Sequence, residues 1–471
     1  MVVGTDDFAR LIREKLPYSP TKQQEALIDT LAAFCMAPQT PDNEVFLLNG
    51  YAGTGKTSVV GALVKALASV GRRSVLLAPT GRAAKVFSRF ASHPAYTIHR
   101  RIYHTDPDSG EFNAIAENTS RPGTVFIVDE ASMIGGDNQS TCTSLLDDLI
   151  EYVYMADGCR LILLGDTAQL PPVGCTQSPA MSREVLRSFG LKVTRVVLTA
   201  TVRQAAESGI LYNATWLRKA MRVDPLPVPL LTLSPFDDVA GVEGTDVPDE
   251  LSDAYSRYGL EETIVVTRSN RAATQYNMAI RNQILEREEM LVPGELIMIA
   301  KNNYYWTRKI KGFDFIANGD VARVVKVLAV EERGGMKFAD VRLTFPDRDI
   351  EVEVKVSLDA LISDTPALSR EQMQHLAEVA ISDPERYPPF MPVERRLKML
   401  RHDPLYNALQ IKYAYAVTCH KSQGGQWDSV FVDMGYIPPE AQGIDFYRWL
   451  YTSVTRAKKE VKFISPRLPV R

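Results

Sequence analysis

A glycine-rich segment, residues 50–57, has the residue types and spacing that bind phosphate groups. It reads GYAGTGKT, which fits the pattern GxxxxGK[ST], and it lies between an apolar run and a helical pattern. Lys56 supplies a positive charge for the β- and γ-phosphate oxygens, and Thr57 supplies a hydroxyl for Mg²⁺. The loop residues whose backbone can wrap the phosphate are Gly53, Thr54 and Gly55. The segment therefore predicts a nucleoside triphosphate site.

Two adjacent acids follow a later apolar run. The run Val125–Val128 is directly followed by Asp129 and Glu130. Asp129 suits the coordination shell of Mg²⁺, and Glu130 suits orienting or deprotonating an attacking water. A strand that ends in two acids is also common in purely structural roles, but a phosphate loop earlier in the same unit favours the catalytic interpretation.

A third group of polar residues suits contact with a γ-phosphate. Gln169, in the segment 163–172, could hold the water or sense the phosphate, whereas Asp166 better suits fixing the loop. Arg203 and Arg456 carry guanidinium groups, which stabilise the equatorial oxygens during phosphoryl transfer. Spacing alone does not show that the two arginines reach the nucleotide. Each alone is more often a surface residue, and Arg456 has no local partner that would require it.

The elements that must position these residues predict an α/β domain with a parallel sheet. Five apolar runs lack the alternation of a half-exposed strand, so we expect strands that are buried on both faces. Helical patterns such as 56–70 and 182–189 lie between them, as in helical crossovers. The predicted strands are residues 44–49, 74–78, 125–128, 160–164 and 193–198. Turn signals at 101–123 predict a small inserted hairpin or loop.

A second α/β unit begins with the apolar run 263–267 and a helix that extends to about residue 287. Three valine-rich runs with turn residues between them predict an inserted antiparallel β module, which also carries a helix at 369–381. The runs of this module are 321–330, 337–345 and 350–356, and the α/β pattern resumes at 411–418, 430–433, 446–456 and 461–464. The predicted domains are 1–205, then 206–305 together with 406–471, and 306–405 as the inserted β-barrel-like module.

Two further segments have distinctive compositions. Residues 224–253 contain several prolines followed by acids with no intervening Lys or Arg, which is typical of a solvated connection between domains. Residues 301–315 place four cations among five aromatic residues. Bases stack on aromatic rings with about 1–3 kcal/mol each, so this segment suits binding of a single nucleic-acid strand. A packed aromatic cluster explains the same composition equally well.

The overall composition is that of a globular chain without a membrane-spanning segment. Hydrophobic residues make up 45% of the 471 residues, and no apolar run approaches the roughly 20 residues of a spanning helix. The N-terminus does not resemble a secretory signal, and five scattered cysteines suit a reducing compartment, so we expect a cytoplasmic protein associated with a bacterial or phage nucleoid. The chain has 54 Lys and Arg residues against 57 Asp and Glu residues, a formal net charge of −3. A nucleic-acid partner would therefore have to bind a local basic surface.

The motifs form an ordered series that resembles one enzyme family. They are residues 20–24 (PTKQQ), 50–57, 78–85 (APTGRAAK), 97–100 (TIHR), 128–133 (VDEASM), 165–174 (GDTAQLPPVG), 201–204 (TVRQ), 417–424 (VTCHKSQG) and 451–458 (YTSVTRAK). The series resembles superfamily 1 DNA helicases, in the 5′→3′ branch that contains PIF-, RecD- and Dda-type enzymes. The matching motifs run from Thr21 to Lys458, nearly the whole chain.

The resemblance implies two RecA-like domains that share ATP across a cleft. It implies that Gln24 reads the adenine, that Arg203 and Arg456 contact the γ-phosphate, and that Gly424 and Gly425 form a turn near the cleft. The implied DNA track consists of Thr80, Gly81, Arg82 and His99 in the first domain and of Thr418, His420, Lys421 and Ser422 in the second. As isolated residues, the two histidines are equally typical of a packed core.

The resemblance further implies a DNA helicase that depends on ATP and Mg²⁺, translocates 5′→3′ on single-stranded DNA and unwinds duplex or folded DNA. Its implied partners are single strands and forked or tailed duplexes, bound by a protein that is monomeric without DNA and serves replication, repair, recombination or telomere maintenance. Residues 101–123 are the candidate strand-separating wedge, because they lie between two track motifs.

Three alternatives to this function differ in their support. Residues 454–455 read Val-Thr where PIF members more often have Leu-Ser, and the motif at 128–133 resembles RecD-type sequences. A RecD-like helicase subunit is therefore one alternative, and a translocase that mainly displaces bound proteins is another. An ATP-dependent nuclease is disfavoured, because no cluster of carboxylates with a lysine lies outside the ATP motifs.

Overall fold

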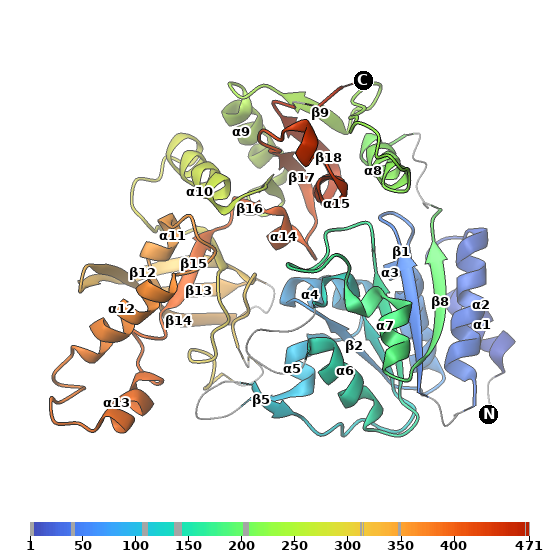
Figure 1. Cartoon of the computed structure of the whole chain (residues 1–471), viewed down its shortest axis with the longest axis horizontal. Coiled ribbons are helices and arrows are strands. Elements are labelled where there is room, and N and C mark those ends of the chain that lie inside the picture. The colour runs from blue at the N-terminus through green and yellow to red at the C-terminus, as the bar shows by residue number, and fades with distance from the viewer. Residues whose placement is uncertain are drawn as a thin grey trace.

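The N-terminal part of the chain forms a six-stranded parallel sheet (Figure 1). The computed structural model describes residues 4–38, 43–105, 112–135, 144–200, 207–310, 313, 315–346, 350–466 and 468–470. In spatial order the strands of the first sheet are β3 (Ala95–Thr97), β2 (Ser74–Ala78), β6 (Val125–Val128), β7 (Arg160–Gly165), β1 (Glu44–Gly50) and β8 (Lys192–Leu198). The five predicted strands are all present, and the short β3 extends the sheet by an edge strand.

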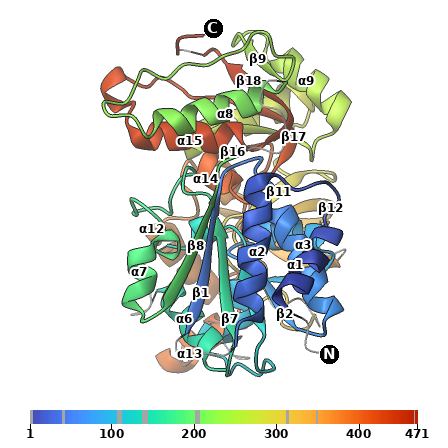
Figure 2. The same ribbon diagram turned by 90° about the vertical axis from the view of Figure 1, so that its right-hand side faces the viewer.

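Helices cover both faces of this sheet (Figure 2). One face carries α1 (Thr5–Glu14), α2 (Lys22–Met36), α3 (Lys56–Ser69) and α4 (Gly81–Ala91), and the other carries α5 (Ile98–Ile102), α6 (Leu145–Tyr154) and α7 (Arg183–Ser188). In β1, Phe46 and Leu48 enter the first core, whereas Val45 and Leu47 enter the second. Both faces of the strand are therefore apolar, which explains the absence of alternation in its sequence.

A small antiparallel hairpin interrupts the first domain between α5 and β6. It pairs β4 (Tyr103–Thr105) with β5 (Phe112–Ile115), as the turn signals at 101–123 predict. The connection at 106–111 lies outside the described residues.

A second parallel sheet has five strands and lies above the first in the view of Figure 1. In spatial order they are β16 (Ala416–Thr418), β10 (Thr263–Thr267), β17 (Trp427–Val432), β18 (Ala457–Ile464) and β9 (Val239–Val242). The helices α9 (Val247–Tyr258) and α10 (Asn270–Ala279, continued by the π-helical turn Ile280–Ile284) lie on one side of this sheet, and α8 (Gly209–Ala220) packs with α15 (Ile444–Val454) on the other. The single turn α14 (Cys419–Ser422) follows β16.

The prediction of a solvated connection at 224–253 is wrong over its second half. Strand β9 pairs in parallel with β18, and Val239 and Val242 are buried in the core of the second domain. Five of the seven acids at 237–253 are exposed, but Asp238 and Glu250 bind groups elsewhere in the chain. Asp238 accepts hydrogen bonds from the Ser208 hydroxyl and the Gly209 N–H, both at 2.7 Å, and thereby caps α8.

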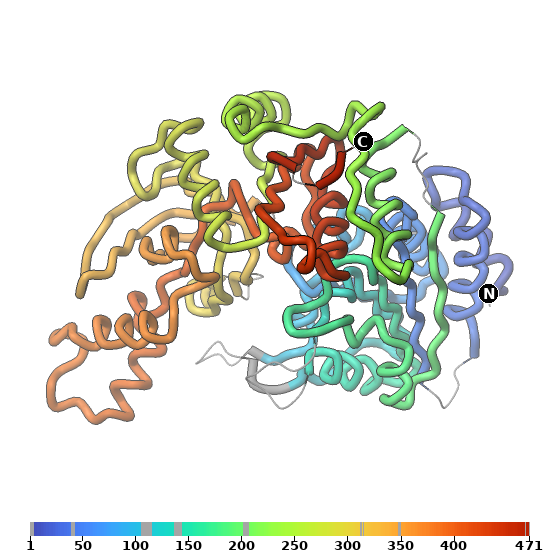
Figure 3. Tube along the Cα trace, turned by 45° about the horizontal axis from the view of Figure 1, so that its top comes forward, coloured from blue at the N-terminus to red at the C-terminus, as the bar shows by residue number. Residues whose placement is uncertain are grey.

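A closed five-stranded barrel is inserted into the second domain. Its strands are β11 (Leu296–Ile299), β12 (Val321–Arg333), β13 (Met336–Phe345), β14 (Ile350–Ser357) and β15 (Leu409–Tyr413). The helices α11 (Asp359–Ile362), α12 (Arg370–Ile381) and α13 (Val393–Leu400) precede β15. Figure 3 shows the barrel and these helices as a lobe beside the two sheets. The two parallel sheets with a hairpin and a barrel confirm the predicted fold class of two RecA-like domains with insertions.

The apolar run predicted as one strand at 411–418 is divided between the barrel and the second sheet. Strand β15 pairs with β11, and β16 pairs with β10. Between them, the side-chain oxygen of Asn277 accepts hydrogen bonds from the N–H groups of Tyr415 (3.0 Å) and Ala416 (2.9 Å). A buried side chain on α10 therefore replaces the strand partners where the chain passes from one sheet to the other.

The aromatic and cationic segment 301–315 is mainly part of a packed cluster. Phe313 and Phe315 are buried, and the ring of Phe313 lies 5.3 Å from that of Phe345 in an edge-on contact. The ring of Tyr304 lies 5.1 Å from that of Phe315. The structure thus favours the packing interpretation of this segment.

Within the described residues, no helix is long and apolar enough to cross a membrane.

Candidate nucleotide site and nucleic-acid interface

The phosphate loop joins the end of β1 to the start of α3, at the edge of the first sheet that faces the second domain (Figure 1). The Lys56 ammonium donates hydrogen bonds to the carbonyls of Gly50 and Tyr51, which it would exchange for phosphate oxygens. A Cβ atom on Gly50 would lie 2.5 Å from the Lys56 side chain, so only glycine leaves room for the lysine here. Sequence and local geometry therefore agree on an anion site at the N-terminus of α3.

The acid pair lies next to the phosphate loop. Asp129 is buried, and burial together with the neighbouring Glu130 raises the pKa of its carboxyl above the usual range, whereas Lys56 lowers it. Glu130 has a left-handed backbone (φ 53°), which is uncommon for a residue with a side chain and typical of strained functional turns. The two neighbouring carboxylates and the hydroxyl of Thr57, the residue after Lys56, are hard oxygen donors. They fit Mg²⁺ because the cation would relieve the repulsion between the carboxylates.

Gln169 lies in the loop after β7 and is buried. Within the part of the chain that the structure describes, its side-chain oxygen has no hydrogen-bond partner, and the same is true of the Ser132 hydroxyl. Both residues line one cavity of about 10 Å³, which is about the space one water occupies. Asp166 accepts from the Ala168 N–H at 2.9 Å and so shapes this loop, as the sequence suggests.

Gln24 contacts the phosphate loop directly. Its side-chain oxygen accepts from the Thr21 N–H (3.0 Å) in a capping box at the start of α2, and its amide nitrogen donates to the Thr54 carbonyl (3.0 Å). The side chain therefore joins α2 to the loop. The contact of Gln24 with the adenine, which the family resemblance implies, stays a prediction.

The expectation that Arg456 is a surface residue without a local partner is wrong. Its side chain is only 3% exposed. Nε donates to the Thr452 carbonyl (3.0 Å), Nη1 to the Gly425 carbonyl (3.1 Å) and Nη2 to the Thr455 hydroxyl (3.2 Å). Thr452 and Thr455 are local partners, whereas the contact with Gly425, 31 positions earlier, leaves no local signal in the sequence. The other predicted arginine, Arg203, lies outside the described residues.

The predicted track motifs of the two domains meet at the turn 424–427. Thr80 caps α4 by accepting from the Ala83 N–H at 3.2 Å. The Arg82 guanidinium lies over the ring of Trp427, 3.9 Å from its centroid, and a Cβ atom on Gly425 would lie 2.7 Å from Arg82 Nε. Arg82 therefore bridges the domains beside the turn that holds Arg456.

The remaining track residues differ in their exposure. His420 is exposed on α14, next to the half-buried Lys421, whereas Ser422 is fully buried and its hydroxyl donates to the Cys419 carbonyl at 2.7 Å. Ser422 therefore faces the interior in this structure. His99 on α5 is half-buried, and burial lowers the pKa of its imidazole.

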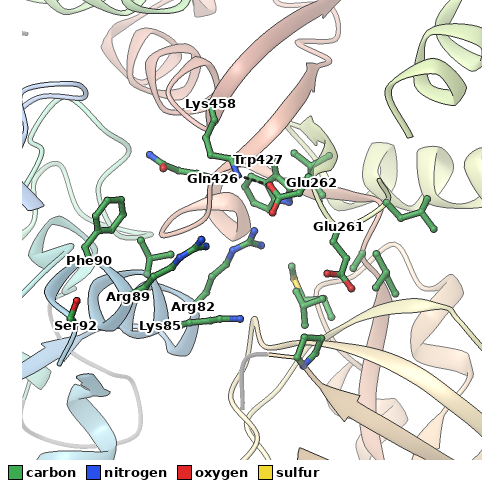
Figure 4. Close-up of a pocket in the computed structure, with 18 of the residues that line it drawn as sticks. Arg82, Lys85, Arg89, Phe90, Ser92, Glu261, Glu262, Gln426, Trp427 and Lys458 are labelled. Carbon is green, nitrogen blue, oxygen red and sulfur yellow. Dashed lines mark hydrogen bonds and ion pairs between the residues drawn. The ribbon is translucent and has the colours of Figure 1, made fainter. Parts of the chain in front are cut away.

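A cavity of about 670 Å³ lies between α4, the start of β10 and the barrel (Figure 4). Arg82, Lys85 and Arg89 of α4 line one wall, and Glu261 and Glu262 lie opposite them. Five cations and two acids line it in all, a formal charge of +3; the cations are Lys65, Arg82, Lys85, Arg89 and Lys458. Glu262 is paired with Lys458 at 2.6 Å. This is the local basic surface that a nearly neutral chain needs for a phosphate-bearing partner.

Sequence reasoning missed several residues at the phosphate loop. Arg218 lies over the ring of Tyr51 at 4.3 Å from its centroid, and Arg222 donates to the Tyr51 hydroxyl. Arg218 is on α8 and Arg222 follows the C-terminus of this helix four residues later, and this spacing was the available signal. Tyr451 on α15 was also missed, although it begins the motif that contains Arg456.

Comparisons with known proteins agree with this geometry. A family model described as an AAA domain matches residues 22–221, and one described as a UvrD-like helicase C-terminal domain matches residues 413–464. Relatives include the ATP-dependent RecD2 DNA helicase of Deinococcus radiodurans (29% identical over 45% of this chain and 25% of that protein) and the ATP-dependent DNA helicase dda of enterobacteria phage T4 (26% over 59% and 62%). The chain thus spans less than two thirds of the length of both relatives.

A solved structure of similar extent is the Pif1 helicase from Bacteroides in complex with ADP-AlF3 and ssDNA. It is 18% identical, with a TM-score of 0.48 over 95% of this chain and 93% of that one. The two family models and the two curated relatives agree with the ordered motifs, and they make this chain similar to ATP-dependent DNA helicases of the RecD2 and Dda types.

Proposed function

We propose that the protein is an ATP-dependent DNA helicase that translocates 5′→3′ on single-stranded DNA and unwinds duplex DNA. The observation that carries this proposal is that the two domains contact each other at both sets of motifs. The Ala52 N–H of the phosphate loop donates to the Tyr451 hydroxyl of the second domain, and Arg82 of the first domain lies over Trp427 of the second. This arrangement allows ATP to change the grip on a strand.

The proposed chemistry is phosphoryl transfer to water. Lys56 and the N-terminus of α3 bind the β- and γ-phosphates, and Gln24 contacts the adenine. Thr57 and Asp129 would hold Mg²⁺, which neutralises phosphate charge. Glu130 orients and deprotonates the attacking water, Gln169 positions it, and Arg456 from the second domain stabilises the charge that develops on the γ-phosphate; Arg203 shares that role by resemblance.

The proposed cycle uses the two domains alternately. ATP favours the closed cleft because both walls bind its phosphates, and hydrolysis with phosphate release favours the open one. The strand crosses Thr80, Gly81, Arg82 and His99, and then Thr418, His420 and Lys421. The hairpin at 101–123 would separate the duplex. In this proposal the protein is a monomer without DNA and acts on nucleoid DNA in the cytoplasm.

The test is unwinding of one duplex that carries either a 5′ or a 3′ single-stranded tail. We expect ATP-dependent strand separation with the 5′ tail and little with the 3′ tail. Equal or opposite preference would overturn the proposed polarity. Two further substrates are assayed in parallel, a forked duplex and a tailed duplex that carries a bound protein. A helicase unwinds the forked duplex, whereas a translocase of the alternative kind mainly displaces the bound protein. Intact product strands exclude a nuclease.

Lys56→Ala should abolish ATP hydrolysis while leaving single-strand DNA binding detectable. The reason is that Lys56 donates to carbonyls of the phosphate loop, whereas the proposed strand contacts lie on α4, α5 and α14. Steady-state hydrolysis and oligonucleotide anisotropy measure the two properties on the same preparation. Hydrolysis near the wild-type rate would contradict the assignment of the phosphate site.

A further inference from the structure

One buried hydroxyl joins the phosphate loop to the second domain. Tyr451, on α15, is 1% exposed. Its hydroxyl donates to a carboxylate oxygen of Asp166 at 2.7 Å and accepts from the N–H of Ala52 in the phosphate loop at 3.0 Å. The tyrosine belongs to the second domain, whereas Ala52 and Asp166 belong to the first. A single oxygen atom therefore connects three segments that lie far apart in the sequence.

The loop that carries Gln169 is held from the second domain at its other end as well. The Leu170 N–H donates to the hydroxyl of Thr452 (2.9 Å), the residue after Tyr451. The Leu170 carbonyl accepts from the side-chain amide of Gln423 (2.8 Å). Gln423 directly follows α14. Both backbone groups of Leu170, the residue after Gln169, are therefore hydrogen-bonded to the second domain.

Helix α15 is also attached to α14, which carries proposed strand contacts. The Ser453 hydroxyl donates to the sulfur of Cys419 at 3.3 Å, and the Cys419 thiol donates to the Trp449 carbonyl at 3.5 Å. All these groups are buried. A displacement of α15 is thus transmitted to α14, where His420 and Lys421 lie.

We propose that Tyr451 is a positioning residue that couples phosphate binding in the loop to the grip of α14 on a single strand. This inference rests on the proposed function. The loop backbone that wraps a phosphate includes the residues next to Ala52, so phosphate binding shifts the Ala52 N–H, which donates to the Tyr451 hydroxyl. The hydroxyl can keep this hydrogen bond and its bond to Asp166 only if α15, which carries Tyr451, moves as well. Two buried hydrogen bonds then make the loop, the Gln169 segment and α15 move as one unit.

The Tyr451 hydroxyl is suited to donating this hydrogen bond to Asp166 at every working pH. Burial and the neighbouring Asp166 raise the pKa of its hydroxyl well above the ordinary value, so the group stays a donor at all working pH values. Phenylalanine would keep the ring and its packing while removing both hydrogen bonds, so Tyr451→Phe isolates the hydroxyl.

The experiment measures how much a nucleotide changes the affinity for a strand. Anisotropy of a labelled single-stranded oligonucleotide gives its Kd with and without a non-hydrolysable ATP analogue and Mg²⁺. The ratio of the two Kd values measures the effect of the nucleotide on strand affinity. We expect Tyr451→Phe to bring this ratio at least fivefold closer to one, while the Kd without nucleotide stays within twofold of the wild-type value. Linkage requires the same reduction in the effect of DNA on analogue affinity.

The matched control is Tyr447→Phe, one helical turn earlier on α15. Tyr447 is also fully buried, and its hydroxyl donates to the Pro227 carbonyl, which belongs to the chain that follows α8. This variant should keep the wild-type ratio. A wild-type ratio in a folded Tyr451→Phe protein, or equal loss in both variants, would overturn the inference. If the wild-type protein fails to bind the oligonucleotide, the proposed function itself fails, which is a distinct outcome.

Discussion

Arg456→Lys should lower DNA-stimulated ATP hydrolysis by about 10³–10⁵-fold, the usual effect of losing an arginine that stabilises the transferring phosphoryl group. Guanidinium has five N–H donors in one plane. Three are bound to Thr452, Gly425 and Thr455, so among the described residues two remain on Nη1 and Nη2 for a phosphate. An ammonium group cannot reproduce that fork, because its charge sits at a single point on a flexible stem.

The lysine variant is preferable to alanine because Arg456 is buried. Removing the whole side chain would leave the Gly425 carbonyl unpaired and lower the stability of the turn 424–427. Arg281→Lys is a matched control: Arg281 is 1% exposed and pairs with Glu295 at 3.0 Å inside the same half of the molecule. That control should lose stability in a thermal melt but retain its turnover per folded molecule. Full DNA stimulation in a folded Arg456→Lys protein would mean that the domains do not share the nucleotide.

Glu130→Gln should slow hydrolysis by about 10²–10⁴-fold while leaving nucleotide affinity nearly unchanged. The amide cannot take a proton from water, whereas Asp129 keeps its carboxylate for Mg²⁺. The left-handed backbone at Glu130 is no more strained for glutamine than for glutamate, so the turn should persist. Single-turnover hydrolysis gives the chemical step, and a fluorescent nucleotide gives the affinity.

Asp129→Asn is the companion variant to Glu130→Gln. It should instead weaken Mg²⁺-dependent nucleotide binding, because it removes a charged oxygen from the proposed metal shell. Collapse of affinity in Glu130→Gln, with little change in Asp129→Asn, would invert the two assignments.

The sequence by itself determined the parallel strands and the phosphate loop, because these depend on short-range patterns. Buried strands of a parallel sheet are continuous apolar runs, and all five predicted in the first domain are present. Glycine and lysine spacing likewise specifies the loop locally, since the lysine folds back against Gly50 only six residues away. The three valine-rich runs of the barrel were equally clear, because each strand pairs with its neighbour in sequence.

The tertiary structure alone decided where long-range partners stabilise a segment. The acidic composition of 237–253 does not reveal that Asp238 binds Ser208 and that Glu250 pairs with Lys462, because both partners lie elsewhere in the chain. The run 411–418 is continuous in hydropathy but enters two sheets, because Asn277 binds its middle. The two bonds of the Tyr451 hydroxyl depend on contacts across the domains. Arg456 is bound in part by the Gly425 carbonyl, which lies 31 positions earlier in the same domain. Hydrogen bonds between residues hundreds of positions apart leave no local pattern, so only the folded chain reveals them.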